Sequence, residues 1–268
     1  MPRYSDHNLR TPHDIHYSWT GWPSGSEFPA TPPAGLLEHL ADALAPDDLV
    51  LESHTWGSGE VHLTVAASPA AAPVWIAQRL KGRLDHALRK QSTPVSFSRK
   101  VSLRAIGHNR TPVVERYVRD QLEHVDLADP KYRQTLASVA VNDPTVDLSE
   151  PALSNRGRYW YSLHVVFVVV QRYRIGERNF LERLRERVME VSGNQGCALK
   201  RVSIMPDHMH IALRGDPKLS PSEIALALQE ATAGVAGCRL WEDDFYVGTF
   251  GDYDYGAVKG AGGGVRLG

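Results

Sequence analysis

Hydrophobic and polar positions in the first half of the chain switch between the period of a strand and the period of a helix. Residues 14–22 alternate as a half-buried strand does, whereas residues 34–44 repeat leucine at the spacing of an amphipathic helix. A later helix has Thr111 as its predicted N-cap and Pro112 at its first position. The predicted elements are a strand at 14–22, a helix at 34–44, a hairpin at 49–56 and 61–66, a helix at 73–90, a strand at 101–106 and a helix at 111–121.

The second half repeats this order after a polar stretch that contains several prolines. We expect residues 126–157 to be a linker, with room for one short helix, between a first domain at 1–125 and a second at 158–268. The last helix is predicted to be capped by Ser220 or Ser222. The predicted elements are a strand at 159–170, a helix at 177–191, a hairpin at 198–204 and 208–213, a helix at 220–236 and a strand at 245–250.

The two halves also match at a fixed offset, which indicates an internal duplication. After the long helix the offset is 144 residues, which places Ile106-Gly107 over Phe250-Gly251. Before it the offset is 148, and three separate elements in one register are not expected from chance. The pairs at 148 are Ile15-His16 with Leu163-His164, Val61-His62-Leu63 with Met209-His210-Ile211, and Ile76-Ala77 with Ile224-Ala225.

Composition places the chain among ordinary globular proteins. Its 268 residues are 42% hydrophobic and 23% charged, and no apolar run reaches the roughly eighteen residues that span a bilayer. The first residues lack the apolar core of a signal peptide, so we expect a cytoplasmic protein without membrane contact. Cys197 and Cys238 have neither metal-type nor redox-type spacing, which favours incidental thiols.

Charge is unevenly distributed along the chain. The net charge of −1 argues against a protein that coats nucleic acid nonspecifically, but a basic run opposed only by Asp85 could contact DNA locally. The competing interpretation is a solvated basic helix face. The candidate DNA-binding residues of this run are Arg79, Lys81, Arg83, Arg89, Lys90, Arg99, Lys100, Arg104 and Arg110.

Two histidines stand out inside the predicted hairpin. His208 and His210 are two apart in an apolar strand, so both imidazoles face one side of the sheet and could share a metal ion. Considered alone, such a pair more often has a structural role than a metal-binding one.

Three segments together resemble the single-tyrosine HUH transposases, which include the insertion-sequence and REP-associated tyrosine transposases. The segments are Met-Pro-Asp-His-Met-His-Ile-Ala-Leu at 205–213, Ser-Leu-His-Val-Val-Phe at 162–167, and Val-Val-Glu-Arg-Tyr-Val-Arg-Asp-Gln at 113–121. The resemblance implies an α/β fold of the ferredoxin-like type with an antiparallel sheet. It also implies that the histidine pair and a glutamine bind Mg²⁺ or Mn²⁺, and that a helix tyrosine attacks single-stranded DNA.

Neither half carries the complete family pattern. Glu60 stands where His208 stands in the second half, so the first histidine pair is damaged. In the second half the tyrosine position falls on Ala261 and the glutamine position on Val265, in a glycine-rich tail that disfavours a helix. Between them the halves hold one full set, and we therefore predict a fused pseudo-dimer with one composite site. That site would combine Tyr117 and Gln121 with His208 and His210.

The expected activity is metal-dependent nicking and rejoining of single-stranded or hairpin DNA through a 5′-phosphotyrosine at Tyr117. A monomeric pseudo-dimer acting on nucleoid DNA, domesticated for DNA-end or origin processing, is the favoured form; higher assembly stays open. A catalytically inactive, transposase-derived DNA-binding protein is the alternative. Glu60 or Asp207 could complete the metal site instead of Gln121, and the nucleophile could have moved to Tyr246, Tyr253 or Tyr255.

Overall fold

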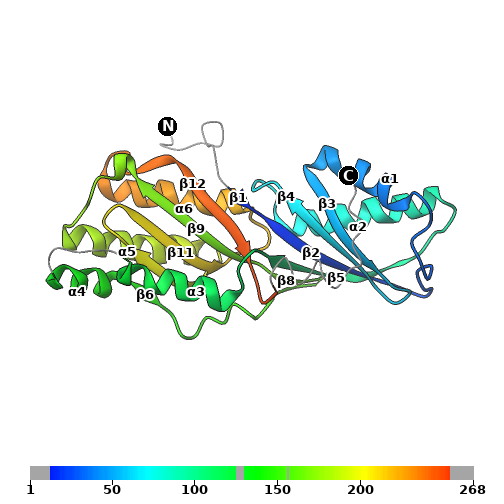
Figure 1. The fold of residues 1–268 in the computed structure, drawn as a ribbon, viewed down its shortest axis with the longest axis horizontal. Coiled ribbons are helices and arrows are strands. Elements are labelled where there is room, and N and C mark those ends of the chain that lie inside the picture. The colour runs from blue at the N-terminus through cyan, green and yellow to red at the C-terminus, as the bar shows by residue number, and fades with distance from the viewer. Residues whose placement is uncertain (1–12, 125–129, 156, 254–268) are drawn as a thin grey trace.

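The computed structural model describes residues 13–124, 130–155 and 157–253. Within this part of the chain, two six-stranded sheets lie side by side along the long axis, accompanied by six α-helices (Figure 1). Sheet A has the order β1-β12-β9-β11-β10-β6 and sheet B the order β3-β4-β2-β5-β8-β7. The fold is mixed α/β with two tandem ferredoxin-like units, as the sequence predicted. None of the described helices is long and apolar enough to cross a membrane.

The first unit forms around sheet B. Alternation along its strands sends every second side chain to the helix-covered face, where Trp19, Leu63 and Leu84 are fully buried. The predicted hairpin and the long helix have nearly the expected bounds, because their periodic patterns are long and uninterrupted. The elements are β2 (His16–Pro23), α1 (Leu36–Leu44), β3 (Leu49–Trp56), β4 (Val61–Ala67), α2 (Pro73–Lys90) and β5 (Phe97–Ile106).

The second unit repeats this arrangement around sheet A. Its central strand order, β12-β9-β11-β10, corresponds to β5-β2-β4-β3 of the first unit. Phe167, Ile211 and Leu228 are fully buried between the sheet and its helices. The elements are β9 (Ser162–Val169), α5 (Arg178–Asn194), β10 (Ala198–Ile204), β11 (His208–Arg214), α6 (Pro221–Ala236) and β12 (Trp241–Phe250).

The two units exchange strands at their shared boundary. Strand β1 (His13–Asp14) comes from the first half but pairs in parallel with β12, whereas β8 (Gly157–Trp160) pairs in parallel with β5. The single strand predicted at 159–170 is therefore two strands, broken at Tyr161, that belong to different sheets.

The segment predicted as a linker also contains regular structure. It includes α4 (Pro130–Val139), β6 (Val141–Asn142) on the edge of sheet A and β7 (Ala152–Ser154) on the edge of sheet B. These strands are too short to give a periodic signal, and their backbone groups are satisfied by edges that only the tertiary structure provides.

Strand register corrects one part of the predicted repeat. In the first unit His62 of β4 pairs with Thr20 of β2, and in the second His210 of β11 pairs with Val166 of β9. Thr20 therefore corresponds to Val166. Two residues earlier on each strand, Ser18, not His16, corresponds to His164. A shift of two residues keeps each side chain on its own face, which is why the hydrophobic pattern did not reveal it. The duplication itself stays a prediction.

Helix α3 (Thr111–Arg119) and the 3₁₀ turn η3 (Asp120–Glu123) follow β5 but cross over to sheet A (Figure 1). Val114 and Val118 pack against Ala212 of β11 and Phe250 of β12. The predicted N-cap was wrong by one residue. Arg110 is the N-cap, because its bridge to Gly251 holds it in the extended conformation, and Thr111 is already helical.

Two glycines make this crossover geometrically feasible. A Cβ atom at Gly107 would overlap the carbonyl oxygen of Thr249, and one at Gly251 would overlap the carbonyl oxygen of Ala105. The ends of β5 and β12 thus cross backbone against backbone, at the two glycines that the sequence repeat pairs.

Candidate active site

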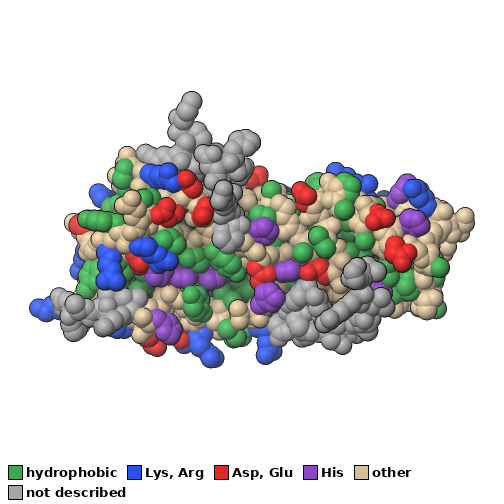
Figure 2. All heavy atoms as spheres, turned by 45° about the horizontal axis from the view of Figure 1, so that its top comes forward, with side chains coloured by type: hydrophobic (Ala, Val, Ile, Leu, Met, Phe, Trp, Pro, Cys, Tyr) green, Lys and Arg blue, Asp and Glu red, His purple; other side chains and the backbone are tan. Residues whose placement is uncertain are grey.

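A pocket of about 570 Å³ lies between α3 and the face of sheet A that α5 and α6 leave open. It is lined by Tyr117 and Gln121 from the first half, and by His164, His208, His210 and Tyr246 from the second. Histidine side chains form a row on the left half of the molecule in Figure 2, the half that contains sheet A in Figure 1. The residues predicted to form a composite site therefore share one pocket.

The histidine pair is held by hydrogen bonds to its Nδ1 atoms. His208 Nδ1 lies 2.7 Å from Asp207 Oδ1, and His210 Nδ1 lies 3.0 Å from His164 Nε2. The two rings of the pair are 5.0 Å apart, as expected for neighbours on one strand face. With Nδ1 engaged, the Nε2 atom of each ring is the one left for a ligand, and a carboxylate behind an imidazole is the usual support of a metal-binding histidine.

Burial keeps part of this cluster uncharged. Desolvation lowers the pKa of His210 to about 2, with His164 and His208 as further causes, and desolvation lowers the pKa of His164 to about 4. His210 is therefore neutral near pH 7, the state in which imidazole nitrogen can coordinate a metal ion. Two imidazoles and an amide oxygen form a donor set that can hold a divalent metal ion.

Tyr117 lies over the histidines with its side chain 48% exposed. Its ring centroid is 5.3 Å from that of His210 and 5.8 Å from that of His164, edge-on in both cases. Gln121 follows four residues later and is buried in the same pocket, where its amide nitrogen donates to the Tyr117 carbonyl at 2.9 Å. That bond leaves the amide oxygen as the atom able to ligate an ion.

Comparison with known proteins adds a family to this geometry. Residues 158–260 match the family model described as "Transposase IS200 like". This segment of the chain is therefore similar to the IS200-like transposases. This transposase segment contains His164, His208 and His210 but not Tyr117, which lies outside the match. The similarity supports a transposase-like, DNA-processing function.

Solved structures give weaker similarities. A protein of Deinococcus radiodurans R1 assigned as a transposase is 19% identical, with 36% of this chain and 84% of that chain covered and a TM-score of 0.33. The regulatory subunit of aspartate kinase from Thermus thermophilus is 10% identical, with 81% and 92% covered and a TM-score of 0.21. Scores this low support no functional argument. No curated protein matches the chain.

The two alternative metal ligands, Glu60 and Asp207, have different places. Glu60 lies on the first unit, where it accepts a hydrogen bond from Trp22 at 3.0 Å and contacts His62 at 3.1 Å. It does not line the pocket that holds His208 and His210, which is called the transposase pocket from here on. Asp207 is beside the pocket, bonded to His208 and, at 3.3 Å, to Arg172. The structure thus gives Asp207 a supporting place behind an imidazole.

The candidate replacement nucleophiles are also separated. Tyr246 lines the transposase pocket, where burial raises the pKa of its hydroxyl. Tyr253 is exposed and does not line it. Tyr255 and the lost positions Ala261 and Val265 lie outside the described residues.

The predicted basic run does not reach the transposase pocket, since none of its nine residues lines it. Part of the run is neutralised locally, because Arg79 and Arg83 both approach Asp47. Five others line two other cavities, with Lys81, Arg89 and Arg99 beside α2, and Lys100 and Arg104 on the opposite side of sheet B.

Sequence reasoning missed two residues of the pocket. Arg172 supplies its cation, from the η4 turn (Val170–Arg172) that follows β9. His164 was given no role in the site, but its Nε2 lies 3.0 Å from His210 Nδ1 in the same pocket. His164 could have been found from its place on the strand next to the histidine pair, because polar residues at alternating positions on neighbouring strands lie on the same face of the sheet.

Proposed function

We propose that this protein is a metal-dependent strand transferase that nicks and rejoins single-stranded DNA through Tyr117. The observation that carries the proposal is the pocket that Tyr117 of the first half shares with the histidine pair of the second, in which the Tyr117 ring lies 5.3 Å from the ring of His210. A helix tyrosine that served only for packing would not need to be half exposed above two imidazoles. The favoured setting is hairpin DNA of the nucleoid, with one chain forming one complete site.

The chemistry assigns a task to each residue. The Tyr117 oxygen attacks phosphorus, the bond from phosphorus to the 3′ oxygen breaks, and the products are a 5′-phosphotyrosine and a free 3′-hydroxyl. The phenol proton passes to solvent or a nearby base. Attack by another 3′-hydroxyl on the phosphotyrosine reverses the step and rejoins the strand, so the energy of the bond is retained.

The remaining residues would hold the metal ion or orient the phosphate. His208, His210 and Gln121 are the ligands for Mg²⁺ or Mn²⁺, which supplies charge stabilisation to the phosphate when bound. Asp207 fixes the tautomer of His208 through Nδ1. Arg172, a cation lining the same pocket, would pair with a phosphate oxygen.

An adduct assay tests the proposal. A labelled hairpin oligonucleotide from DNA flanking the gene is incubated with protein and Mn²⁺, and the covalent complex is separated on a denaturing gel. We expect an adduct with the unaltered protein, none with Tyr117→Phe, and none when the metal is chelated. Tyr246→Phe is the matched control, because it removes the other tyrosine hydroxyl of the pocket and should leave the adduct.

Two results would contradict the assignment. An adduct that persists in Tyr117→Phe and disappears in Tyr246→Phe would move the nucleophile to β12. Tight hairpin binding with no adduct under any metal would favour the catalytically inactive DNA-binding alternative.

A further inference from the structure

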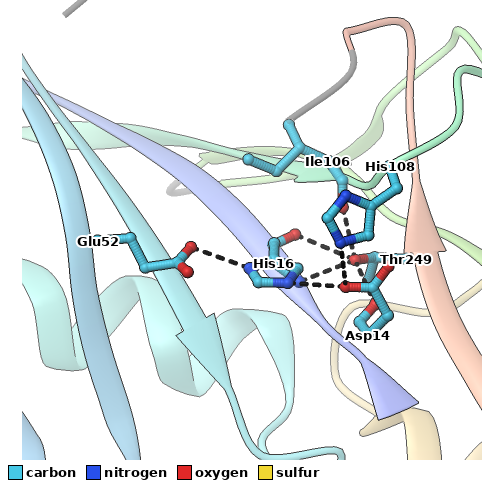
Figure 3. Close-up of polar contacts among 6 residues, drawn as sticks. All are labelled: Asp14, His16, Glu52, Ile106, His108 and Thr249. Atoms are coloured by element: carbon cyan, nitrogen blue, oxygen red, sulfur yellow. Dashed lines mark hydrogen bonds and ion pairs between the residues drawn. The ribbon is translucent and has the colours of Figure 1, made fainter. Parts of the chain in front are cut away.

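A second group of candidate metal ligands lies at the junction of the two sheets, outside the transposase pocket. Asp14 ends β1 on sheet A, His16 begins β2 on sheet B, and His108 follows β5 (Figure 3). One ligand atom from each of these residues lies within 4.8 Å of the others. Two chain segments that are distant in sequence, one with Asp14 and His16 and the other with His108, thus present two imidazoles and a carboxylate to one point.

The distances suit a small divalent ion. His16 Nε2 is 2.7 Å and His108 Nε2 is 3.6 Å from the same atom, Asp14 Oδ1. Around a tetrahedral ion with bonds near 2.0–2.1 Å, ligand atoms are separated by about 3.3 Å. The two observed distances bracket that value, and all three ligand atoms lie within 4.8 Å of one another, so rotation of the side chains could bring them around one ion.

Glu52 supports this arrangement from behind. Its Oε2 lies 2.9 Å from His16 Nδ1, on the side of the ring opposite Asp14 (Figure 3). A carboxylate that accepts from Nδ1 fixes the tautomer that presents Nε2 and makes that nitrogen a stronger donor. This partner could not be found from local pattern, because Glu52 belongs to β3 and meets His16 only across the folded sheet.

The backbone that carries these ligands is itself tied together. The His16 amide donates to Thr249 Oγ1 at 2.9 Å, and the Thr249 hydroxyl lies 2.7 Å from the Ile106 carbonyl oxygen (Figure 3). Thr249 is buried on β12, so strands β2, β5 and β12 are linked beside the candidate ligands. A site built on packed strands holds its ligand spacing better than one built on loops.

We propose that Asp14, His16 and His108 form a second metal site that takes a first-row transition-metal ion of the Zn²⁺ type, with Glu52 as positioning residue. Two imidazoles and one carboxylate leave a further coordination position for water.

The location gives the ion a structural consequence. His108 lies three residues before Thr111, where the helix that carries Tyr117 begins. An ion shared by His108, Asp14 and His16 would fasten that connection to both sheets. This site does not depend on the proposed DNA chemistry, and its occupancy can be measured without DNA.

Cobalt titration tests the site, because Co²⁺ replaces Zn²⁺ and its visible absorption reports coordination by protein. The host is the full chain with His208→Ala and His210→Ala, which removes the first metal site. We expect a saturable band with one ion per chain, abolished by excess Zn²⁺. Adding His108→Ala should remove the band, whereas adding His86→Ala, an exposed histidine on α2, should not. Glu52→Gln should weaken Co²⁺ binding about 10–100-fold.

The proposal would be overturned if the protein with His208→Ala and His210→Ala showed no Co²⁺ absorption band, or if that band persisted after His108→Ala was added. Zn²⁺ content after dialysis gives a second measurement on otherwise unaltered protein, where His108→Ala should lower the metal bound by one ion per chain. Equal Zn²⁺ content in the two proteins would also refute the site. The adduct assay with Tyr117→Phe reports on the transposase pocket alone, so failures of the two proposals are distinguishable.

Discussion

Replacing Gly107 by alanine should destabilise the protein more than its single methyl group suggests. Gly107 connects β5 to the segment that leads into α3, and it lies against β12 of the other unit. An added Cβ would overlap the Thr249 carbonyl oxygen and would lie 3.1 Å from the Thr249 carbonyl carbon and 3.3 Å from Phe250 Cα. All three obstructing atoms are backbone, so no side-chain rotation can relieve the clash.

The expected cost follows from what must move. Thr249 Oγ1 contacts the carbonyls of Asp14, His16 and Ile106, so a displaced β12 loses or stretches several of these bonds. Overpacking a dense interior typically costs about 1–3 kcal/mol, and we place Gly107→Ala in the upper half of that range. Gly251→Ala should cost a similar amount, because its Cβ would overlap the Ala105 carbonyl oxygen.

Urea unfolding measures this difference directly. The matched control is Gly82→Ala on α2, where a Cβ meets no atom within 4 Å and helix propensity favours alanine by up to about 1 kcal/mol. The double variant at Gly107 and Gly251 should cost less than the sum of the single changes, because both act on one crossing. If Gly107→Ala unfolds at the same urea concentration as the unaltered protein, the backbone crossing is wrong.

Three further changes address the candidate site and its support. Asp207→Asn should weaken Mn²⁺ binding about 10–100-fold in calorimetric titration, because His208 loses the carboxylate behind Nδ1; an unchanged affinity would remove Asp207 from the site. Val118→Ala should destabilise the chain by about 2 kcal/mol in urea, because Val118 is 1% exposed and packs with sheet A; a neutral result would mean that α3 is not docked there. Ser220→Ala should lower the free energy of unfolding by about 0.5–2 kcal/mol, because it breaks the capping box with Glu223, whereas Ser222→Ala should change it by no more than about 0.5 kcal/mol. Equal effects would contradict Ser220 as the N-cap.

The elements that the sequence predicted well are those whose periodicity is long. The hairpin of β3 and β4 and the helix α2 carry uninterrupted alternation or helical spacing, and their bounds differ from expectation by at most one residue. The histidine pair was predictable for the same reason, since a period of two fixes its common face regardless of the partner strand. Local pattern therefore specified both the secondary structure and the face on which the candidate chemistry lies.

The contacts between the halves were not predictable in this way. Nothing in the apolar run at 159–170 marks Tyr161 as the point where the chain leaves one sheet and enters the other, because Tyr159, Tyr161 and Leu163 are all buried. Glu52 and Arg172 acquire their partners only from strand neighbours or loops brought together by folding. Such pairings depend on sheet register and edge exchange, which hydrophobic periodicity does not encode.

The crossing of β5 and β12 explains why the composite site joins the two halves. Residues 107–110 alone separate β5 from α3, so the direction of the chain at the crossing decides which sheet receives the helix. There the Thr111 amide donates to the Gly251 carbonyl at 2.8 Å and Arg110 bridges Gly251, which aligns the helix start with the end of β12. Helix α3 therefore packs on the sheet that carries the histidine pair. A site shared between the halves is thus a consequence of a short connection and two glycines, and it requires no second chain.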